Sequence, residues 1–188
     1  AAQQAEQAKQ AAAETARIAA EEHAKFLAKY LNAGFTRQPG NRSVAIVIST
    51  DDGAPSSTVK TALARRFQSG LVQITTSLFT PAFVADGLFN DALANSTELF
   101  RKLDLAKSVD ALVLAQEDIQ YAQNPALENI ITATIQLNVN VVSVSGQSDN
   151  LSWTFKANGP GFSKEVARKA AEDRLIKQIS TDTKMSLN

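Results

Sequence analysis

The chain has 188 residues and no cysteine. Disulfides, thiolate nucleophiles and cysteine-ligated metal sites are therefore excluded. Histidine occurs once, as His23 in an alanine-rich segment, where the pattern indicates a solvated helix position and no Ser-His-Asp arrangement. Nineteen basic residues balance nineteen acidic ones, and Lys and Arg form no run. Neither the overall field nor a local patch favours nucleic acid as a partner.

Long apolar runs are missing as well. A membrane-spanning helix needs roughly 18–20 apolar residues, and no stretch of the chain approaches this. No signal peptide is recognisable. Because the chain begins at Ala1 without Met, we expect targeting information and any membrane tether to lie upstream of Ala1.

What is present resembles an ordinary globular domain with an appendage, 44% hydrophobic and 20% charged. Strong helix formers dominate up to about residue 33. Large apolar residues enter only late, at Ile18, Phe26, Leu27, Tyr30 and Leu31. We therefore expect a spacer helix and linker over residues 1–40, a globular domain over 41–182 and a frayed tail over 183–188.

Strands and helices alternate in the first half of the domain. Serine at 56 or 57 is placed to cap one helix, and Gly87 or Asn95 is expected to break the helical region before the third strand. The predicted strands are 43–49, 71–77 and 110–121, and the predicted helix between the first two ends at 68.

The second half is a predicted hairpin followed by a helix. Residues 130–145 alternate between apolar and polar, with a phase slip at Val141 and Val142 that predicts a β-bulge. Residues 151–157 return as the partner strand, and a helix follows over 163–180. The element order strand–helix–strand–helix–strand–strand–strand–helix predicts an α/β fold with a mixed sheet of about five strands, flanking helices and a long alanine-rich N-terminal helix.

The glycine-rich stretch "NGPGFS" at 158–163 could be a phosphate-binding loop or a turn before a helix. It has neither the Lys-Ser/Thr ending of a Walker loop nor a G-x-G-x-x-G spacing. We therefore interpret it as a turn with Ser163 as the N-cap.

Asp51 and Asp52 follow the first strand, where open parallel sheets bind ligands. With Ser56 at the next helix start, they make a candidate pocket for magnesium and phosphate, as in phospho-receiver domains. The third strand supplies no matching acceptor, and turn chemistry is the competing interpretation. Glu117 and Asp118 would point to opposite faces of a strand, which does not suit a pair of catalytic carboxylates.

Two features favour protein contact. The hairpin edge could accept a partner strand, and Phe79, Phe83 and Phe89 lie in an apolar segment that could expose a contact patch. The alternating strand could instead insert into a membrane, but its partner strand is short and contains Lys156.

The succession of "SVAIVIS", "LARRFQSG", "VDALVLAQEDIQ", a long hairpin and "FSKEVARKAAEDRLIKQI" resembles the α/β domain of bacterial envelope lipoproteins. The group meant is that of the CsgG-like and LpoB-like proteins, which are akin to the TolB N-terminal domain. The resemblance covers about residues 43–179. It implies a non-catalytic module of the cell envelope, and it carries over no functional residue.

From this we expect a non-catalytic interaction or assembly-accessory domain of the bacterial cell envelope, without cofactor or metal. It would recognise a protein or an envelope polymer, and a homo-oligomer stays open. The expected location is extracytoplasmic, either periplasmic or anchored through sequence upstream of Ala1. The alternative is a domain that binds a small ligand or magnesium phosphate through Asp51 and Asp52.

Overall fold

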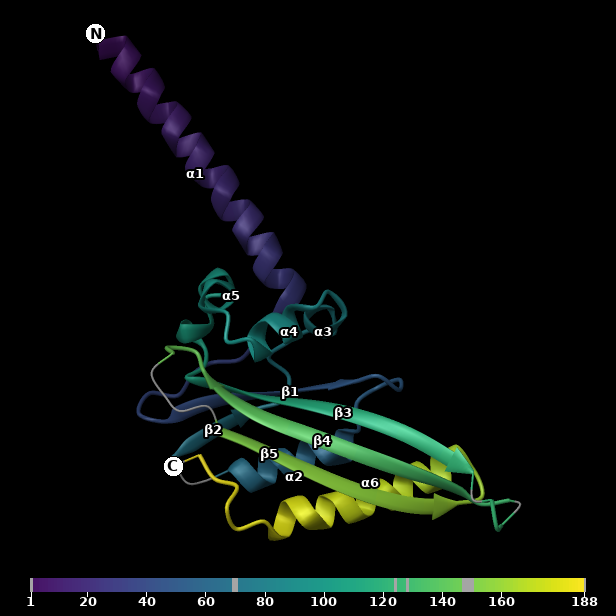
Figure 1. Ribbon diagram of the computed structural model, residues 1–188. Coiled ribbons are helices and arrows are strands. Elements are labelled where there is room, and N and C mark those ends of the chain that lie inside the picture. The colour runs from purple at the N-terminus through teal and green to yellow at the C-terminus, as the bar shows by residue number, and fades with distance from the viewer. Residues whose placement is uncertain (1, 69–70, 124, 128, 147–150, 188) are drawn as a thin grey trace.

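A computed structural model describes residues 2–68, 71–123, 125–127, 129–146 and 151–187 of the chain. Its α/β fold confirms the predicted fold class: a five-stranded mixed sheet carries helices on both faces and is preceded by a long helix (Figure 1). None of the described helices combines the length and the apolar character needed to cross a membrane.

The long N-terminal helix α1 (Ala2–Tyr30) projects away from the sheet, and only its last turns contact the domain (Figure 1). Ile18 is exposed, while Tyr30 is buried and packs edge-on against Phe26 with 5.0 Å between the ring centroids. The Tyr30 hydroxyl donates to a carboxylate oxygen of Asp86 at 3.0 Å. A stretch that offers mostly alanine has little apolar surface to bury, so the helix is anchored at its C-terminal end.

The sheet has the strand order β2-β1-β3-β4-β5. β1 runs parallel to β2 and β3, and β4 pairs antiparallel with both β3 and β5. The parallel strands are joined through helices, as a crossover between parallel neighbours requires. The strands are β1 (Arg42–Thr50), β2 (Val72–Thr75), β3 (Ala111–Gln123), β4 (Ile131–Ser143) and β5 (Leu151–Gly161).

One face of the sheet is covered by α2 (Ser57–Phe67) and α6 (Lys164–Thr181) (Figure 1). The side chains of Ser56 and Ser163 accept hydrogen bonds from backbone N–H groups three residues on, which confirms both predicted N-caps. The core on this side is built from alternate residues of every long strand together with the apolar stripes of the two helices.

The opposite face is covered only at one end, by the short helices α3 (Ala82–Ala85), α4 (Leu88–Leu93) and α5 (Thr97–Lys102) and the turn η1 (Leu105–Lys107) (Figure 1). The sequence predicts a break at Gly87 or Asn95, and the helical region is interrupted at both, where φ is positive at 83° and 57°.

The predicted bulge in β4 is wrong. The pairing of β3 with β4 runs without an offset from Ala111↔Ser143 to Gln123↔Ile131. The alternation of apolar and polar residues breaks at Val141 and Val142 because both faces of the sheet are covered at the end of β4, so consecutive residues are buried there. Val141 points to the α6 side, whereas Val142 and Val144 belong to the core beneath the short helices.

The predicted turn at 158–161 is also wrong, since β5 continues to Gly161. A Cβ on Gly159 would lie 2.1 Å from the backbone nitrogen of Ala171, and one on Gly161 would lie 2.3 Å from that of Ala167. The glycines are therefore required by the close approach of α6 to the strand rather than by a turn.

The tail differs from the expected frayed end. Asp182 accepts hydrogen bonds from the backbone N–H groups of Lys184 and Met185 through Oδ1. The Met185 side chain is fully buried in the core on the α2/α6 side, and Arg42 donates to the Leu187 carbonyl. The burial of Met185 and these hydrogen bonds together hold the segment on the domain.

Candidate functional site

The residues predicted as a ligand pocket lie where β1 ends and the loop to α2 begins. Asp52 accepts a hydrogen bond from the Tyr121 hydroxyl at 2.9 Å through Oδ2. Asp51 is exposed at the surface. Tyr121 comes from the end of β3, so the third strand does supply a partner to this loop, in the form of a phenol rather than an acceptor carboxylate.

Arg168 of α6 holds the same loop from the helix side. Its guanidinium donates to the backbone carbonyls of Asp52 at 3.1 Å and Ala54 at 3.3 Å, and to a carboxylate oxygen of Glu172 at 2.9 Å. The guanidinium offers five N–H donors on three nitrogens in a fixed planar fork, which suits this kind of multiple contact. Arg168 therefore connects α6 to the loop that carries Asp51 and Asp52.

Beneath Arg168 lies a buried carboxylate. The side chain of Glu117, in β3, is fully buried, and its Oε2 lies 3.7 Å from Nη2 of Arg168. Within the described part of the chain, neither oxygen receives a hydrogen bond. Burial raises the pKa of Glu117 above its ordinary value, and the charge of Arg168 acts in the opposite direction. As predicted, Glu117 and Asp118 belong to opposite faces of the strand, because Asp118 lies on the face away from α6.

Ser56 is engaged in capping. Its hydroxyl accepts from the Val59 N–H at 3.3 Å and contacts Glu172 Oε2 at 3.1 Å and Thr58 Oγ1 at 2.8 Å. Over the described residues, no group of three or more histidine, cysteine or acidic side chains is placed to hold a metal ion. A magnesium ion bound at this loop would therefore take its ligands from Asp51, Asp52 and solvent.

The phenol of Tyr121 is held in its protonated form in this cluster. Burial and the neighbouring Asp52 carboxylate raise the pKa of Tyr121 to about 12. A general base is most effective with a pKa near the working pH, and the phenol of Tyr121 lies far above that range. What the cluster does chemically is to join α6, β3 and the loop after β1 through charge-assisted hydrogen bonds.

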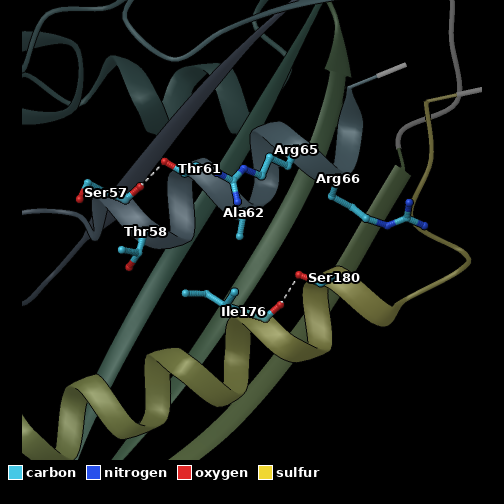
Figure 2. A pocket seen from close by; sticks show the side chains of 8 residues that line it. All are labelled: Ser57, Thr58, Thr61, Ala62, Arg65, Arg66, Ile176 and Ser180. Atoms are coloured by element: carbon cyan, nitrogen blue, oxygen red, sulfur yellow. Dashed lines mark hydrogen bonds between the residues drawn. The ribbon is translucent and has the colours of Figure 1, made fainter. Parts of the chain in front are cut away.

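Apart from this polar cluster, a hollow of 520 Å³ lies between α2 and α6 (Figure 2). The hydroxyls of Thr61 and Ser180 donate to carbonyls of their own helices, both at 2.8 Å, and Arg66 donates to the carbonyl of Asp182. Among the described residues, its lining includes no histidine or carboxylate side chain. The lining residues are Ser57, Thr58, Thr61, Ala62, Arg65, Arg66, Ile176 and Ser180.

The phenylalanines predicted as a partner contact are mostly core. Phe83 is 0% and Phe89 2% exposed, both in the cluster beneath the short helices. Phe79 is partly buried and stacks on Phe83 with 4.1 Å between ring centroids. Of the three rings, only Phe79 offers surface to a partner, because the sheet face beneath the short helices needs the other two to fill its core.

An exposed aromatic side chain lies elsewhere. Phe162, between β5 and Ser163, is 79% exposed, and Val166 in the first turn of α6 is 53% exposed. Phe162 also lines a hollow with Tyr121 and Ile131 at the ends of the long strands. Large apolar side chains exposed together are the informative departure from normal surface composition. We call Phe162 and Val166 the distal tip.

The second surface of interest is the face of β3, β4 and β5 that the short helices leave uncovered, here called the open face. Thr154 donates to Oδ1 of Asn138 across the strands at 3.0 Å, and Asp118 and Lys156 are its charged residues. The residues of the open face are Gln116, Asp118, Gln120, Thr132, Thr134, Gln136, Asn138, Asn140, Ser152, Thr154, Lys156, Asn158 and Pro160.

Sequence reasoning did not single out Arg168, Tyr121 or Phe162. Glu117 and Tyr121 share the phase of the inward residues of β3, so their burial could have been inferred from the alternation. Nothing local in the sequence indicates that Arg168 reaches the loop after β1, because that contact spans 116 residues.

No protein-family model and no curated protein sequence matches the chain. Solved structures do show similarity. The hypothetical protein CT253 from Chlamydia trachomatis is similar with a TM-score of 0.47 and 12% identity, over 74% of this chain and 93% of that one. Lipoprotein GNA1162 from Neisseria meningitidis is similar with a TM-score of 0.40 and 13% identity, over 75% of this chain and 99% of that one.

Proposed function

We propose that the chain is a non-catalytic interaction domain of the bacterial cell envelope, which presents its distal tip to a protein partner while α1 acts as a spacer. The observation that carries the proposal is the 79% exposure of Phe162 beside the exposed Val166. Aromatic anchors near the centre of an interface supply a large share of the binding energy.

The placement of the tip fits this role. β3 and β5 both end at the side of the domain that points away from α1 (Figure 1). A tether at the start of α1 would hold the domain at a distance from its anchor, with Phe162 directed outward. A straight helix of 29 residues is about 44 Å long at 1.5 Å per residue.

The open face supports the same proposal, since it adjoins the tip and carries few charges. The outer side of α6 is densely charged, with Lys169 and Asp173 paired at 3.3 Å and Arg174 and Lys177 exposed. Interfaces are depleted in charged residues relative to the rest of the surface. The contrast favours the open face over α6 as an extension of the contact.

The envelope location rests on the resemblance of the strand and helix sequences described above, and on an alanine-rich helix suited to a spacer. The non-catalytic assignment rests on the polar cluster at the end of β1, whose side chains are committed to holding the fold together.

Site-specific photo-crosslinking tests the proposal. A photoreactive phenylalanine analogue placed at position 162 in the full-length protein, in the cells that produce it, should give discrete crosslinked protein species. Leu71 is the matched control, because it is 72% exposed and lies at the start of β2, on the other edge of the sheet. The same analogue at position 71 should give none of these species.

A second variant separates contact from folding. Phe162→Ser should remove the partner from co-purified material without lowering the Tm, since the ring is exposed. Crosslinks of equal pattern from positions 162 and 71, or co-purification unaffected by Phe162→Ser, would show that the tip is not the contact surface.

A further inference from the structure

We propose that a slot at the outer edge of β1 binds the free C-terminus of a peptide with an apolar last residue. β2 stops early: its pairing with β1 ends at Ala45↔Thr75, although β1 continues to Thr50. The remaining edge of β1 faces a cavity of 330 Å³. Ligand cavities in proteins span about 300–1,000 Å³, so this one is suited to the end of a peptide rather than to a large ligand.

The floor of the slot offers backbone hydrogen-bonding groups. Arg42 donates its N–H toward β2, to the Leu71 carbonyl at 2.9 Å, while the Ser43 carbonyl faces β3 and accepts from Asp110. Because successive residues of a strand direct their amides to alternate sides, Ile48 and Thr50 present theirs on the side that β2 has vacated. An extended peptide can pair with such an edge.

The direction of the peptide follows from the position of a cation. Lys60 lies in the first turn of α2, beyond the carboxyl end of β1, and lines the slot. Its ammonium forms no hydrogen bond or ion pair with any described residue. If the peptide carboxylate lies near Lys60, the C-terminus of the peptide is at the same end as that of β1. The peptide then runs parallel to β1 and extends the sheet where β2 stops.

The walls supply the apolar component. Phe79 and Val84 line the side toward α3, and Pro55 lines the side toward α2. These side chains match an apolar last residue, while the charge of Lys60 matches the carboxylate. Together with the amide edge they define the occupant as a C-terminal peptide. The slot and Phe162 lie at opposite edges of the sheet, so this inference and the proposed function can fail independently.

Peptide binding to the full chain tests the inference. The probes are fluorescein-labelled pentapeptides ending in Val, Leu, Ile or Phe, each with a free carboxylate or as the C-terminal amide, followed by fluorescence anisotropy. We expect saturable binding of at least one free-acid peptide, with at least about tenfold weaker binding of its amide. Lys60→Met should abolish the preference for the acid. Lys177→Met is the matched control, because Lys177 is exposed on α6 and its ammonium has no partner among the described residues.

Amide shifts locate the peptide independently of any variant. In ¹⁵N-labelled protein, the free-acid peptide should shift the N–H signals of Ile48 and Thr50 and leave those of β5 unchanged. Absence of binding at about 1 mM peptide, equal binding of acid and amide, an equal loss in Lys177→Met, or shifts that bypass Ile48 would each overturn the inference. Binding of isovalerate as tight as that of the peptide would also overturn it, since a small carboxylate would then be the occupant.

Discussion

The guanidinium of Arg168 lies 3.7 Å from the buried carboxylate of Glu117 and donates to two carbonyls of the loop after β1. One side chain of the last helix thus contacts the third strand and the end of the first. The acidic pair Asp51 and Asp52 is held at the surface of this assembly rather than gathered around an internal cavity.

Glu117 should make stability depend on pH. Burial raises its pKa in the folded state above the ordinary value of 4.5. The stability that the protonated form contributes is therefore fully present below the unfolded pKa and is lost as pH rises through the folded one. The Tm of Glu117→Gln minus that of wild type should be more positive at pH 8 than at pH 5. For a chain of this size 1 kcal/mol corresponds to roughly 2–4 °C.

The control for this experiment is Asp118→Asn, a change of the same charge on the neighbouring residue of the open face. Its effect on Tm should be small and similar at both pH values. Thermal unfolding followed by circular dichroism provides the measurement, and parallel pH profiles for Glu117→Gln and wild type would contradict the assignment.

Gly159→Ala should be severely destabilising. The added Cβ would lie 2.1 Å from the backbone nitrogen of Ala171, and backbone cannot move aside as a flexible side chain can. We expect a loss of at least about 3 kcal/mol in the free energy of unfolding, the upper end for overpacked sites. Pro160→Ala, on the exposed face of the same strand, should change it far less. The free energy of unfolding of both variants is measured by urea unfolding. Equal midpoints for the two would show that α6 does not approach β5 this closely.

Met185→Ala should destabilise the domain although Met185 lies only three residues before Asn188. The side chain is 0% exposed, so truncation leaves a cavity in the core on the α2/α6 side. The expected cost is about 2–5 kcal/mol. Lys184→Ala, at an exposed position next to it, is the control. If both variants have the same free energy of unfolding as wild type in chemical unfolding, Met185 is not packed in the core and the tail is frayed, as the sequence predicted.

Removal of residues 1–22 should leave the domain as stable as before, within about 0.5 kcal/mol, because the described side chains of this stretch are exposed. The truncated chain should show a weaker helical signal in far-ultraviolet circular dichroism than wild type and the same Tm. Tyr30→Ala, in contrast, removes a buried ring and its hydrogen bond to Asp86, and should cost about 3 kcal/mol. A large loss of Tm on truncation would mean that α1 packs along more of its length.

Several features of the fold follow from local sequence alone. Ser56 and Ser163 stand directly before helix-forming segments, so their capping roles could be predicted. Gly87 and Asn95 were identifiable as helix breaks, because glycine and asparagine adopt the positive φ angles found at both positions more readily than other residues do. The alternation in β4 placed one face inward correctly up to Val141.

Other residues could be assigned only with their neighbours in space. Gly159 looks like a turn residue until α6 is laid across it, and Val142 looks like a bulge until the short helices cover it. Phe83 and Phe162 are the same residue type and each lies just before or at the start of a helix, yet one is 0% and the other 79% exposed.

The sequence by itself determined the order of strands and helices, the helix caps and the helical character of the first segment, because these depend on residue preferences and on periodicity over a few positions. The tertiary structure alone decided which glycines α6 approaches closely, which side chain holds the loop after β1 and which aromatic ring faces the solvent. Those outcomes depend on contacts between residues as far apart as Asp52 and Arg168, which no local pattern encodes.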